Sequence, residues 1–335
     1  MGRSSIVPKR EAPVVVDHHR AAEVPAGTGV SGRSRGTSGR RRLFSAWIDR
    51  HFGVLLVLPA VALIVLLSAY PLVYSLWVDV VNYDFQIPGH DFVGLQNFKD
   101  VVVDPVAATA LVNTIVLSSA VVSLELVLGL LLAVAMVRPF RGRGIVMPIV
   151  IMPLFMSPAI VGQFWGLLLQ RPFGPTDYVL SQLLRHPVTI SWLTEAPWNY
   201  IAIVLADAWQ WTPFMFVILL AGFTSISPEL YEAGQLDGAS PWHSFFRITL
   251  PLVAPILLLA VAFRLLDAVK LFDVIYIMTG GGPGTTTYTA AFYLYEKGFQ
   301  EFHISQATAG SWMFLILTIP VVSVLVRRLL RPETA

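Results

Sequence analysis

The sequence predicts an all-α membrane protein with six transmembrane helices. Hydrophobic residues make up 55% of the 335 residues and charged residues only 13%, which is too little charge to cover a soluble domain. Apolar stretches long enough to cross a bilayer recur along the chain, and arginines gather in alternate connections between them. The formal net charge of +2 does not favour nucleic acid as a partner, and the absence of cysteine excludes disulfides and thiolate metal sites.

Residues 1–43 are predicted to form a disordered, basic cytoplasmic tail. They are rich in Gly, Ser, Pro and Arg and show no apolar periodicity, so they cannot bury enough surface to fold. A cleaved signal peptide is the alternative. The basic part is too long for one, however, and the apolar segment that follows is too extended.

Six apolar stretches of about 20 residues or more can each cross a hydrocarbon core of roughly 30 Å as a helix. They are residues 52–78, 110–137, 144–170, 200–223, 249–279 and 307–327. This pattern divides the chain into the tail, a first helix with its outer loop (44–109), a core domain (110–327) and a cytoplasmic C-terminus (328–335).

The placement of arginines sets the expected orientation of these helices. Basic residues precede the first stretch, fill the 138–143 connection and follow the sixth stretch. The 79–104 connection and the connection after the fifth stretch are acidic or mixed instead. By the positive-inside rule, we expect both termini, the 138–143 connection and the 224–248 connection in the cytoplasm.

The third stretch contains Pro148, Pro153 and Pro158, each of which removes a backbone donor and bends a helix. Carbonyl groups freed at membrane depth persist only against protein or a wet cavity. We therefore expect this helix to border a pathway. A plain packing kink explains any single one of the three prolines equally well.

The fifth stretch carries four ionisable residues at a strict spacing of three. They are Arg264, Asp267, Lys270 and Asp273. Such groups are unfavourable in lipid unless they are paired or face water, and this spacing lets Arg264 pair with Asp267 and Asp267 pair with Lys270. We interpret them as a polar strip that lines a cavity and meets the hydroxyl groups of a substrate. The alternative is a set of ion pairs that only locks this helix to its neighbours.

The fourth stretch holds a polar and aromatic cluster toward its middle. The candidate pathway residues there are Asp207, Trp209, Gln210, Trp211 and Phe214. Indole faces can stack on sugar rings, and a carboxylate and an amide can bind hydroxyl groups. Tryptophan also collects at membrane interfaces for lipid reasons alone, but the central position of this cluster favours a pathway.

No residue pattern of a catalytic or metal site is visible. The seven histidines fall in the tail, the loops or the edges of the stretches, with no pair at metal-ligand spacing inside a stretch. The Gly280-Gly-Gly-Pro-Gly284 run lacks the lysine and hydroxyl of a phosphate-binding loop, and it predicts the turn that ends the fifth helix. We expect no cofactor in this chain.

The connection between the fourth and fifth stretches has the pattern of two short helices with a turn between them. Ser227 and Pro228 predict the start of the first helix, and Gly238 predicts the break before the second. A capped polar element between two membrane helices is suited to a soluble partner. Its sequence runs Glu232-Ala-Gly-Gln-Leu-Asp237-Gly238-Ala239, followed by Phe246, Ile248, Leu250-Pro251 and Pro255.

This segment resembles the EAA loop of permease subunits in binding-protein-dependent ABC importers, in particular carbohydrate importers of the maltose, trehalose and glycerol-phosphate kind. Phe92-Val-Gly-Leu-Gln-Asn-Phe98 and Thr279-Gly-Gly-Gly-Pro283 are similar to accompanying motifs of sugar permeases, and the resemblance covers residues 45–330. Gly234 stands where that family usually has alanine, and glycine costs up to about 1 kcal/mol in a helix interior.

The resemblance implies a type I ABC importer permease fold whose 224–248 loop docks into an ATPase subunit. The loop residues implied in this coupling are Glu232, Ala233, Gly234, Asp237, Gly238 and Ala239. ATP and Mg are then expected on two separate ATPase subunits. The other implied partners are a second permease, an extracytoplasmic substrate-binding lipoprotein and membrane lipids. The implied function is ATP-driven import of a sugar such as trehalose or maltose by alternating access.

Three other functions compete with sugar import. A permease for glycerol phosphate or an osmolyte would use Arg264 and Lys270 to face an anion. An ion-coupled secondary transporter also needs charges inside the membrane, but it gives no reason for the 232–255 segment, and the chain shows no second repeat. A membrane-embedded enzyme lacks a nucleophile, a metal site and a base cluster here.

Overall fold

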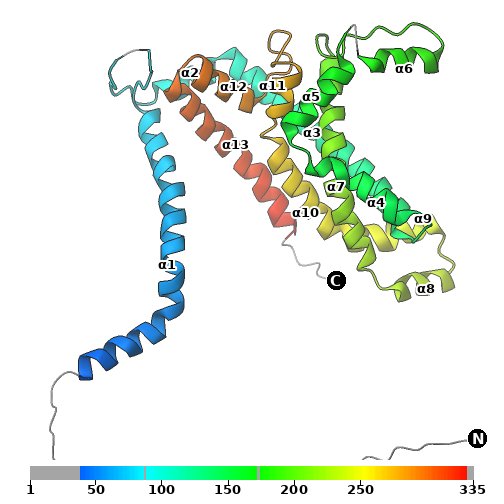
Figure 1. Ribbon diagram of the computed structural model, residues 1–335, viewed down its shortest axis with the longest axis horizontal. Helices are drawn as coiled ribbons and strands as arrows, with labels where there is room; N and C mark the ends of the chain where they lie inside the picture. The colour runs from blue at the N-terminus through cyan, green and yellow to red at the C-terminus, as the bar shows by residue number, and fades with distance from the viewer. Residues whose placement is uncertain (1–37, 87, 172–173, 330–335) are drawn as a thin grey trace, which may run out of the picture. The chain divides into compact units, whose positions relative to one another are not determined.

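The computed structural model describes residues 38–86, 88–171 and 174–329, and these residues form helices joined by turns and loops (Figure 1). Within these ranges no strand occurs beyond two isolated antiparallel bridges, Val81 with Phe92 and Asp84 with His303. The predicted all-α class is therefore confirmed. The chain divides into two compact units, residues 1–65 and 66–335.

Helix α1 (Ser38–Asp79) contains the first predicted membrane stretch. Within its apolar part, Leu56–Asp79, the most apolar 18-residue window has a mean hydropathy of 2.5 and contains no buried residue. A helix that is apolar on every side and unburied is suited to contact with lipid. The helix begins at Ser38, before the expected tail boundary at residue 43, and residues 1–37 of the predicted tail lie outside the described residues.

The Phe92–Phe98 motif folds back on the end of α1 and leads into helix α2 (Gln96–Val103). The buried Asn97 amide donates to the backbone oxygen of Asp79 at 2.8 Å and to that of Val81 at 3.0 Å. Because these two carbonyl groups lie at the end of a helix, they need donors from elsewhere. The motif therefore serves here as the cap that ends α1.

Helices α3 (Pro105–Val137) and α7 (Trp198–Thr224) form the centre of the larger unit. The apolar window of α7 is 61% buried and that of α3 is 33% buried. The helices approach closely at Gly129, where an added Cβ atom would lie 2.6 Å from the Cβ atom of Met215. Helix α3 starts five residues before the predicted position, because Asp104 caps it by accepting from the Val106 amide at 2.8 Å.

The third predicted stretch is broken rather than only kinked. Helix α4 (Arg143–Ile151) continues into a 3₁₀ turn (Met152–Phe155), and helix α5 (Pro158–Leu169) follows at an angle of 102°. Pro153 and Pro158 each open a new helical segment, whereas Pro148 lies inside α4 without ending it. Helix α6 (Pro175–Leu184) follows this pair.

The prediction of a single fifth helix over 249–279 is wrong at both ends. After α8 (Pro228–Leu236), the chain is helical from α9 (Pro241–Ser244) through a π-helical turn (Phe245–Thr249) into α10 (Leu250–Ala268). Ser240 starts this helix by accepting from the His243 amide at 3.3 Å. Residues 269–272 then break the helix, and α11 (Asp273–Met278) begins a separate short one.

The remaining elements are α12 (Ala290–Tyr295), a π-helical turn (Glu296–Gln300) and α13 (Ile304–Leu329), which lies at the sixth predicted stretch. Among the described residues, four helices are long and apolar enough to cross a membrane, and the bent α4–α5 pair makes five. Helix α13, with 26 residues, spans about 39 Å at a rise of roughly 1.5 Å per residue, which is also long enough to cross.

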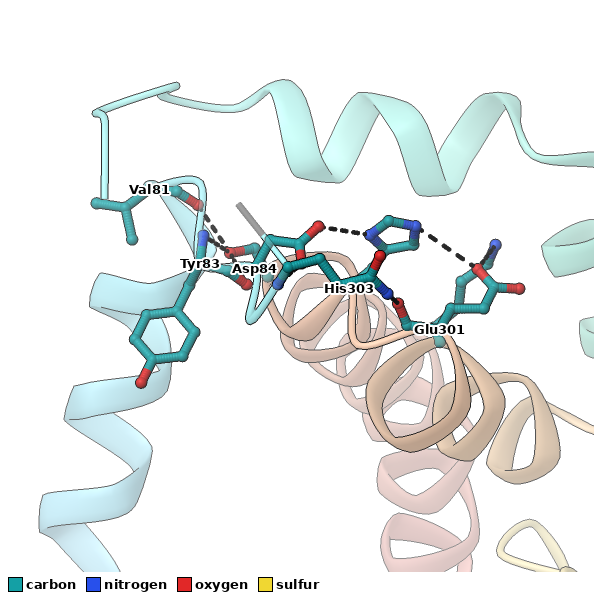
Figure 2. Close-up of polar contacts among 8 residues, drawn as sticks. Val81, Tyr83, Asp84, Glu301 and His303 are labelled. Carbon is teal, nitrogen blue, oxygen red and sulfur yellow. Dashed lines mark hydrogen bonds and ion pairs between the residues drawn. The ribbon is translucent and has the colours of Figure 1, made fainter. Parts of the chain in front are cut away.

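A polar network joins the 81–84 segment to the start of α13 (Figure 2). The Tyr83 amide donates to Ser305 Oγ at 2.7 Å, and that hydroxyl donates to the Val81 carbonyl at 2.8 Å. His303 Nδ1 lies 3.1 Å from Asp84 Oδ2. These contacts, together with the Asn97 cap, hold the loop after α1 against the rest of the larger unit.

Candidate functional site

The centre of the larger unit contains a buried ion cluster around Arg264 of α10. Its guanidinium donates twice to Glu125 of α3, from Nε and Nη2, at 2.8 Å each. Nη2 also donates to Asp207 of α7. The side chains of Arg264 and Glu125 are at most 1% exposed. Three helices are therefore joined through one guanidinium, with its bidentate pair to Glu125 as the best-defined contact.

Asp267 is the fourth member of this cluster, and it differs from the others in its exposure. Arg264 Nη1 donates to Asp267 Oδ2 at 2.9 Å, which confirms the predicted pair along the helix. The Asp267 side chain is 52% exposed. One carboxylate of the cluster is thus exposed at the surface of α10.

The predicted pair between Asp267 and Lys270 is absent from the part of the chain that the structure describes. The reason is the end of α10 at Ala268. The Lys270 amide donates to the Asp267 carbonyl at 2.9 Å, and this tighter turn removes the helical spacing on which the prediction relied. The continuous four-residue strip on one helix face is therefore wrong beyond Asp267.

A cavity of about 230 Å³ nevertheless brings most of the predicted pathway residues together. It lies beside the ion cluster, where α7, the start of α5 and the break between α10 and α11 meet. Six of the nine predicted pathway residues line it, namely Asp207, Trp211, Arg264, Asp267, Lys270 and Asp273. Lys270 and Asp273 thus line the same cavity as Asp267, although the helix that was predicted to align them ends at Ala268.

The other three predicted pathway residues lie in other surroundings. Trp209 packs against Phe164 and Trp165, with ring centroids 6.1 and 6.3 Å apart. Gln210 is buried and donates to the Met156 carbonyl at 2.8 Å, so it supplies a donor at the break before α5. Phe214 lies edge-to-face against Trp211 at 6.3 Å. None of the three lines the cavity, although Phe214 contacts a residue that does, Trp211.

Sequence reasoning missed Glu125, although it is fully buried at the centre of the cluster. The signal was present, because Glu125 is the sole ionisable residue in the 110–137 stretch. An isolated carboxylate at membrane depth requires a partner, and Arg264 was available in another stretch.

The Thr279–Pro283 motif forms the turn that the glycine run predicts. Helix α11 ends at Met278, and Gly280, Gly281 and Gly284 take positive φ angles. Asn113 of α3 donates to the carbonyl groups of Thr285 and Tyr288 at 3.0 and 2.9 Å. The turn is therefore fastened to α3 at the end of the unit that also contains α2 and α12 (Figure 1).

The 224–248 connection lies at the opposite end of the unit and forms the two predicted short helices, α8 and α9 (Figure 1). Helix α8 has no buried residue, and Glu232, Ala233, Asp237 and Gly238 are exposed. The predicted break is confirmed, because Gly238 has φ +78° between the two helices. Two apolar side chains also face outward there, with Leu236 90% and Trp242 74% exposed.

Gly234 is partly buried by contacts inside this connection. An added Cβ atom at Gly234 would lie 2.9 Å from Ile248 Cδ1 in the π-helical turn. Tyr231 also contacts Thr249 through their hydroxyl groups at 3.0 Å. Ser227 occupies the predicted N-cap position, but its side chain makes no capping hydrogen bond. Helix α8 is therefore held to the π-helical turn through Tyr231 and Gly234.

No group of three or more His, Cys, Asp or Glu side chains in the described residues is arranged to hold a metal ion. The chemistry available at the cavity is hydrogen bonding and charge.

Comparison with known protein families shows to which family the chain belongs. Residues 125–331 match the family described as the binding-protein-dependent transport system inner membrane component. The chain belongs to this family. It is an ABC transporter permease of the inner membrane, with several membrane-crossing helices. This assignment decides against the ion-coupled transporter and the membrane enzyme.

Two curated relatives of this permease match almost over their whole lengths. A probable ABC transporter permease protein, y4oQ, of Sinorhizobium fredii is 36% identical, and the match covers 82% of this chain and 88% of that one. The trehalose/maltose transport system permease protein MalF of Thermococcus litoralis is 35% identical over 84% of this chain and 96% of that one.

A solved structure supports the permease fold. The crystal structure of a bacterial ABC transporter involved in the import of the acidic polysaccharide alginate matches with a TM-score of 0.74 and 25% identity. The match covers 88% of this chain and 100% of that chain.

Proposed function

We propose that this permease is one of two different permease subunits in an ATP-driven importer of a carbohydrate or polyol. ATP and Mg bind to two separate cytoplasmic ATPase subunits. Their closure moves the docked α8–α9 connection and so tilts α7 and α10, which alternates access to the cavity beside Arg264. An extracytoplasmic binding protein delivers the substrate.

The observation that carries this proposal is the exposed α8–α9 connection between two membrane helices. Its outward-facing side combines the carboxylates of Glu232 and Asp237 with the apolar side chains of Leu236 and Trp242. Large apolar side chains beside charges, on an element with little packing of its own, favour a protein partner. The connection is continuous with α7 and α10, so a force applied to it reaches the cavity residues on both helices.

The substrate class is supported by the cavity and by the relatives. Hydroxyl groups can donate to the open carboxylates of Asp267 and Asp273, and the Trp211 indole offers a face for a sugar ring. The relatives named above are a trehalose/maltose permease and a transporter of the acidic polysaccharide alginate, both of which transport carbohydrates.

The orientation follows the arginine placement, with both termini and the α8–α9 connection in the cytoplasm. The opposite end, with α2 and α12, then faces the binding protein.

Glu232→Lys and Gly238→Trp are expected to weaken association with the ATPase, because the first reverses a charge on the docking surface and the second strains a positive φ angle and adds bulk. The measurement is co-purification of the ATPase subunits with this chain, followed by ATP-dependent uptake in proteoliposomes. We expect both quantities to fall by about tenfold or more, the usual effect of disrupting a central interface position.

Glu195→Lys is the matched control, because it makes the same charge reversal at an exposed residue before α7, at the other end of that helix. It should leave association unchanged. Normal association and uptake in both α8–α9 variants would refute the docking role.

A further inference from the structure

We propose that the cavity beside Arg264 selects an uncharged substrate and excludes anions, because its buried cation, the Arg264 guanidinium, is already bound by the protein's own carboxylates. This inference rests on the proposed transport function and narrows its substrate class. It bears on the glycerol-phosphate alternative, in which Arg264 and Lys270 would receive an anion.

The first step concerns the hydrogen bonds that Arg264 already makes. All three guanidinium nitrogens donate to carboxylates, with Glu125 bound in a bidentate pair and Asp207 and Asp267 on the remaining edge. One face of the guanidinium lies over the Trp211 ring, with Cζ 4.7 Å from the ring centroid. With its side chain 1% exposed, Arg264 acts as a tie between helices and presents no free edge to a phosphate.

The second step is the charge that the cavity presents. Four carboxyl groups surround it or bind its arginine, namely those of Glu125, Asp207, Asp267 and Asp273. Only Arg264 and Lys270 oppose them, which leaves a formal charge of −2. An anion entering the cavity therefore meets like charge, which disfavours it in a site of low dielectric.

The third step is Lys270, which makes no ion pair among the residues that the structure describes. It lines the cavity between Asp267 and Asp273 along the chain. Because Asp267 and Asp273 line the same cavity, their carboxylates offset part of the field of the Lys270 ammonium, which can donate to a hydroxyl oxygen but does not make an anion site by itself. Carboxylates on each side accept from hydroxyl groups, which fits a polyhydroxylated molecule without charge.

The test compares two nearly isosteric variants, Asp267→Asn and Lys270→Gln, in the complete assembly reconstituted in proteoliposomes. The probes are trehalose, which is uncharged, and sn-glycerol 3-phosphate, which is anionic. The amide in Asp267→Asn keeps an oxygen that Arg264 can bind, so the helix contact survives. ATP-dependent uptake of each probe and co-purification of the subunits are measured for each protein.

We expect the unmodified protein to take up trehalose in preference to sn-glycerol 3-phosphate. Asp267→Asn should lower trehalose uptake by about tenfold or more, the factor for losing a hydrogen bond to a charged acceptor. Lys270→Gln should lower it by less, because the Gln amide can still donate to a hydroxyl oxygen. Preferential uptake of sn-glycerol 3-phosphate, or a tenfold loss in Lys270→Gln, would overturn the inference while leaving the transport function intact. Unchanged uptake in Asp267→Asn would also overturn it. Uptake of neither probe by an assembly whose subunits still co-purify would also overturn the inference, whereas failure of the unmodified chain to co-purify with the ATPase subunits would refute the proposed function.

Discussion

At the scale of single residues, the contacts of Arg264 differ widely in what they contribute. Glu125 is fully buried and binds through two hydrogen bonds of 2.8 Å, whereas Asp267 is half exposed and its pair is screened by solvent. Removing one partner of a buried pair leaves an uncompensated charge, so the cost is larger than the net value of the pair. Glu125 is therefore the residue on which the position of Arg264 depends most.

Glu125→Ala is expected to destabilise the protein by about 3 kcal/mol, because it opens a cavity and strips the guanidinium of its bidentate partner. The measurement is thermal unfolding of the purified protein in detergent. Glu195→Ala, at an exposed position, is the control and should change stability by less than about 0.5 kcal/mol. Equal unfolding temperatures for the two variants would contradict the importance of the buried pair.

Outside the membrane-spanning helices, burial also affects the protonation of Tyr293. Burial raises the pKa of its hydroxyl, and the hydrogen bond that it donates to Asp104 at 3.0 Å raises it further. The hydroxyl therefore stays protonated and keeps α12 attached to the N-cap of α3.

At the scale of elements, capping groups and close contacts decide where the helices begin, end and cross. Asp104 and Ser240 start α3 and the α9–α10 helix earlier than hydropathy indicates, and Pro158 turns the α4–α5 pair through 102°. The closest crossing, between α3 and α7, depends on Gly129. Its missing Cβ atom leaves room for the Met215 Cβ atom and for the Phe216 backbone nitrogen, 2.6 and 3.0 Å from where a Cβ would stand.

Gly129→Ala is expected to push α3 and α7 apart and to destabilise the protein by about 1–3 kcal/mol, the range for overpacked interiors. Gly144→Ala is the matched control, since a Cβ atom there meets nothing within 4 Å. Thermal unfolding in detergent and ATP-dependent uptake are the measurements. A Gly129→Ala protein as stable as the control would show that this crossing is not tightly packed.

At the scale of the whole molecule, the functional parts lie at three levels along the helices of the larger unit. The α8–α9 connection lies at one end, and α2, α12 and the glycine-rich turn lie at the other (Figure 1). The ion cluster joins α3, α7 and α10 between them. In the proposed mechanism, motion of the connection reaches the cavity through α7 and α10, two of the helices that Arg264 joins.

The proposed orientation can be tested with single cysteines, because the chain has none of its own. Asp91→Cys, in the loop after α1, should react with a membrane-impermeant maleimide in intact cells. Gly144→Cys, at the start of α4, should react only after the membrane is permeabilised, since the adjoining 138–143 connection is basic. Labelling of both positions from the same side would refute the topology.

The sequence alone determined the helical class, the order of the membrane helices and the place of the α8–α9 connection. These features depend on apolar length and on local backbone chemistry, such as Pro228 at a helix start and Gly238 at a break. Local sequence patterns also predicted nine pathway residues, and six of them line one cavity. The prediction was wrong, however, in treating Lys270 and Asp273 as part of one unbroken helix.

Only the tertiary structure decided which groups hold Arg264. Its partners Glu125 and Asp207 lie 139 and 57 residues away in the chain, and no local spacing connects them. The pairing arises because α3 and α7 cross closely at Gly129 and α10 packs against both, which brings the three buried side chains together. The charge that the cavity presents to a substrate follows from that packing.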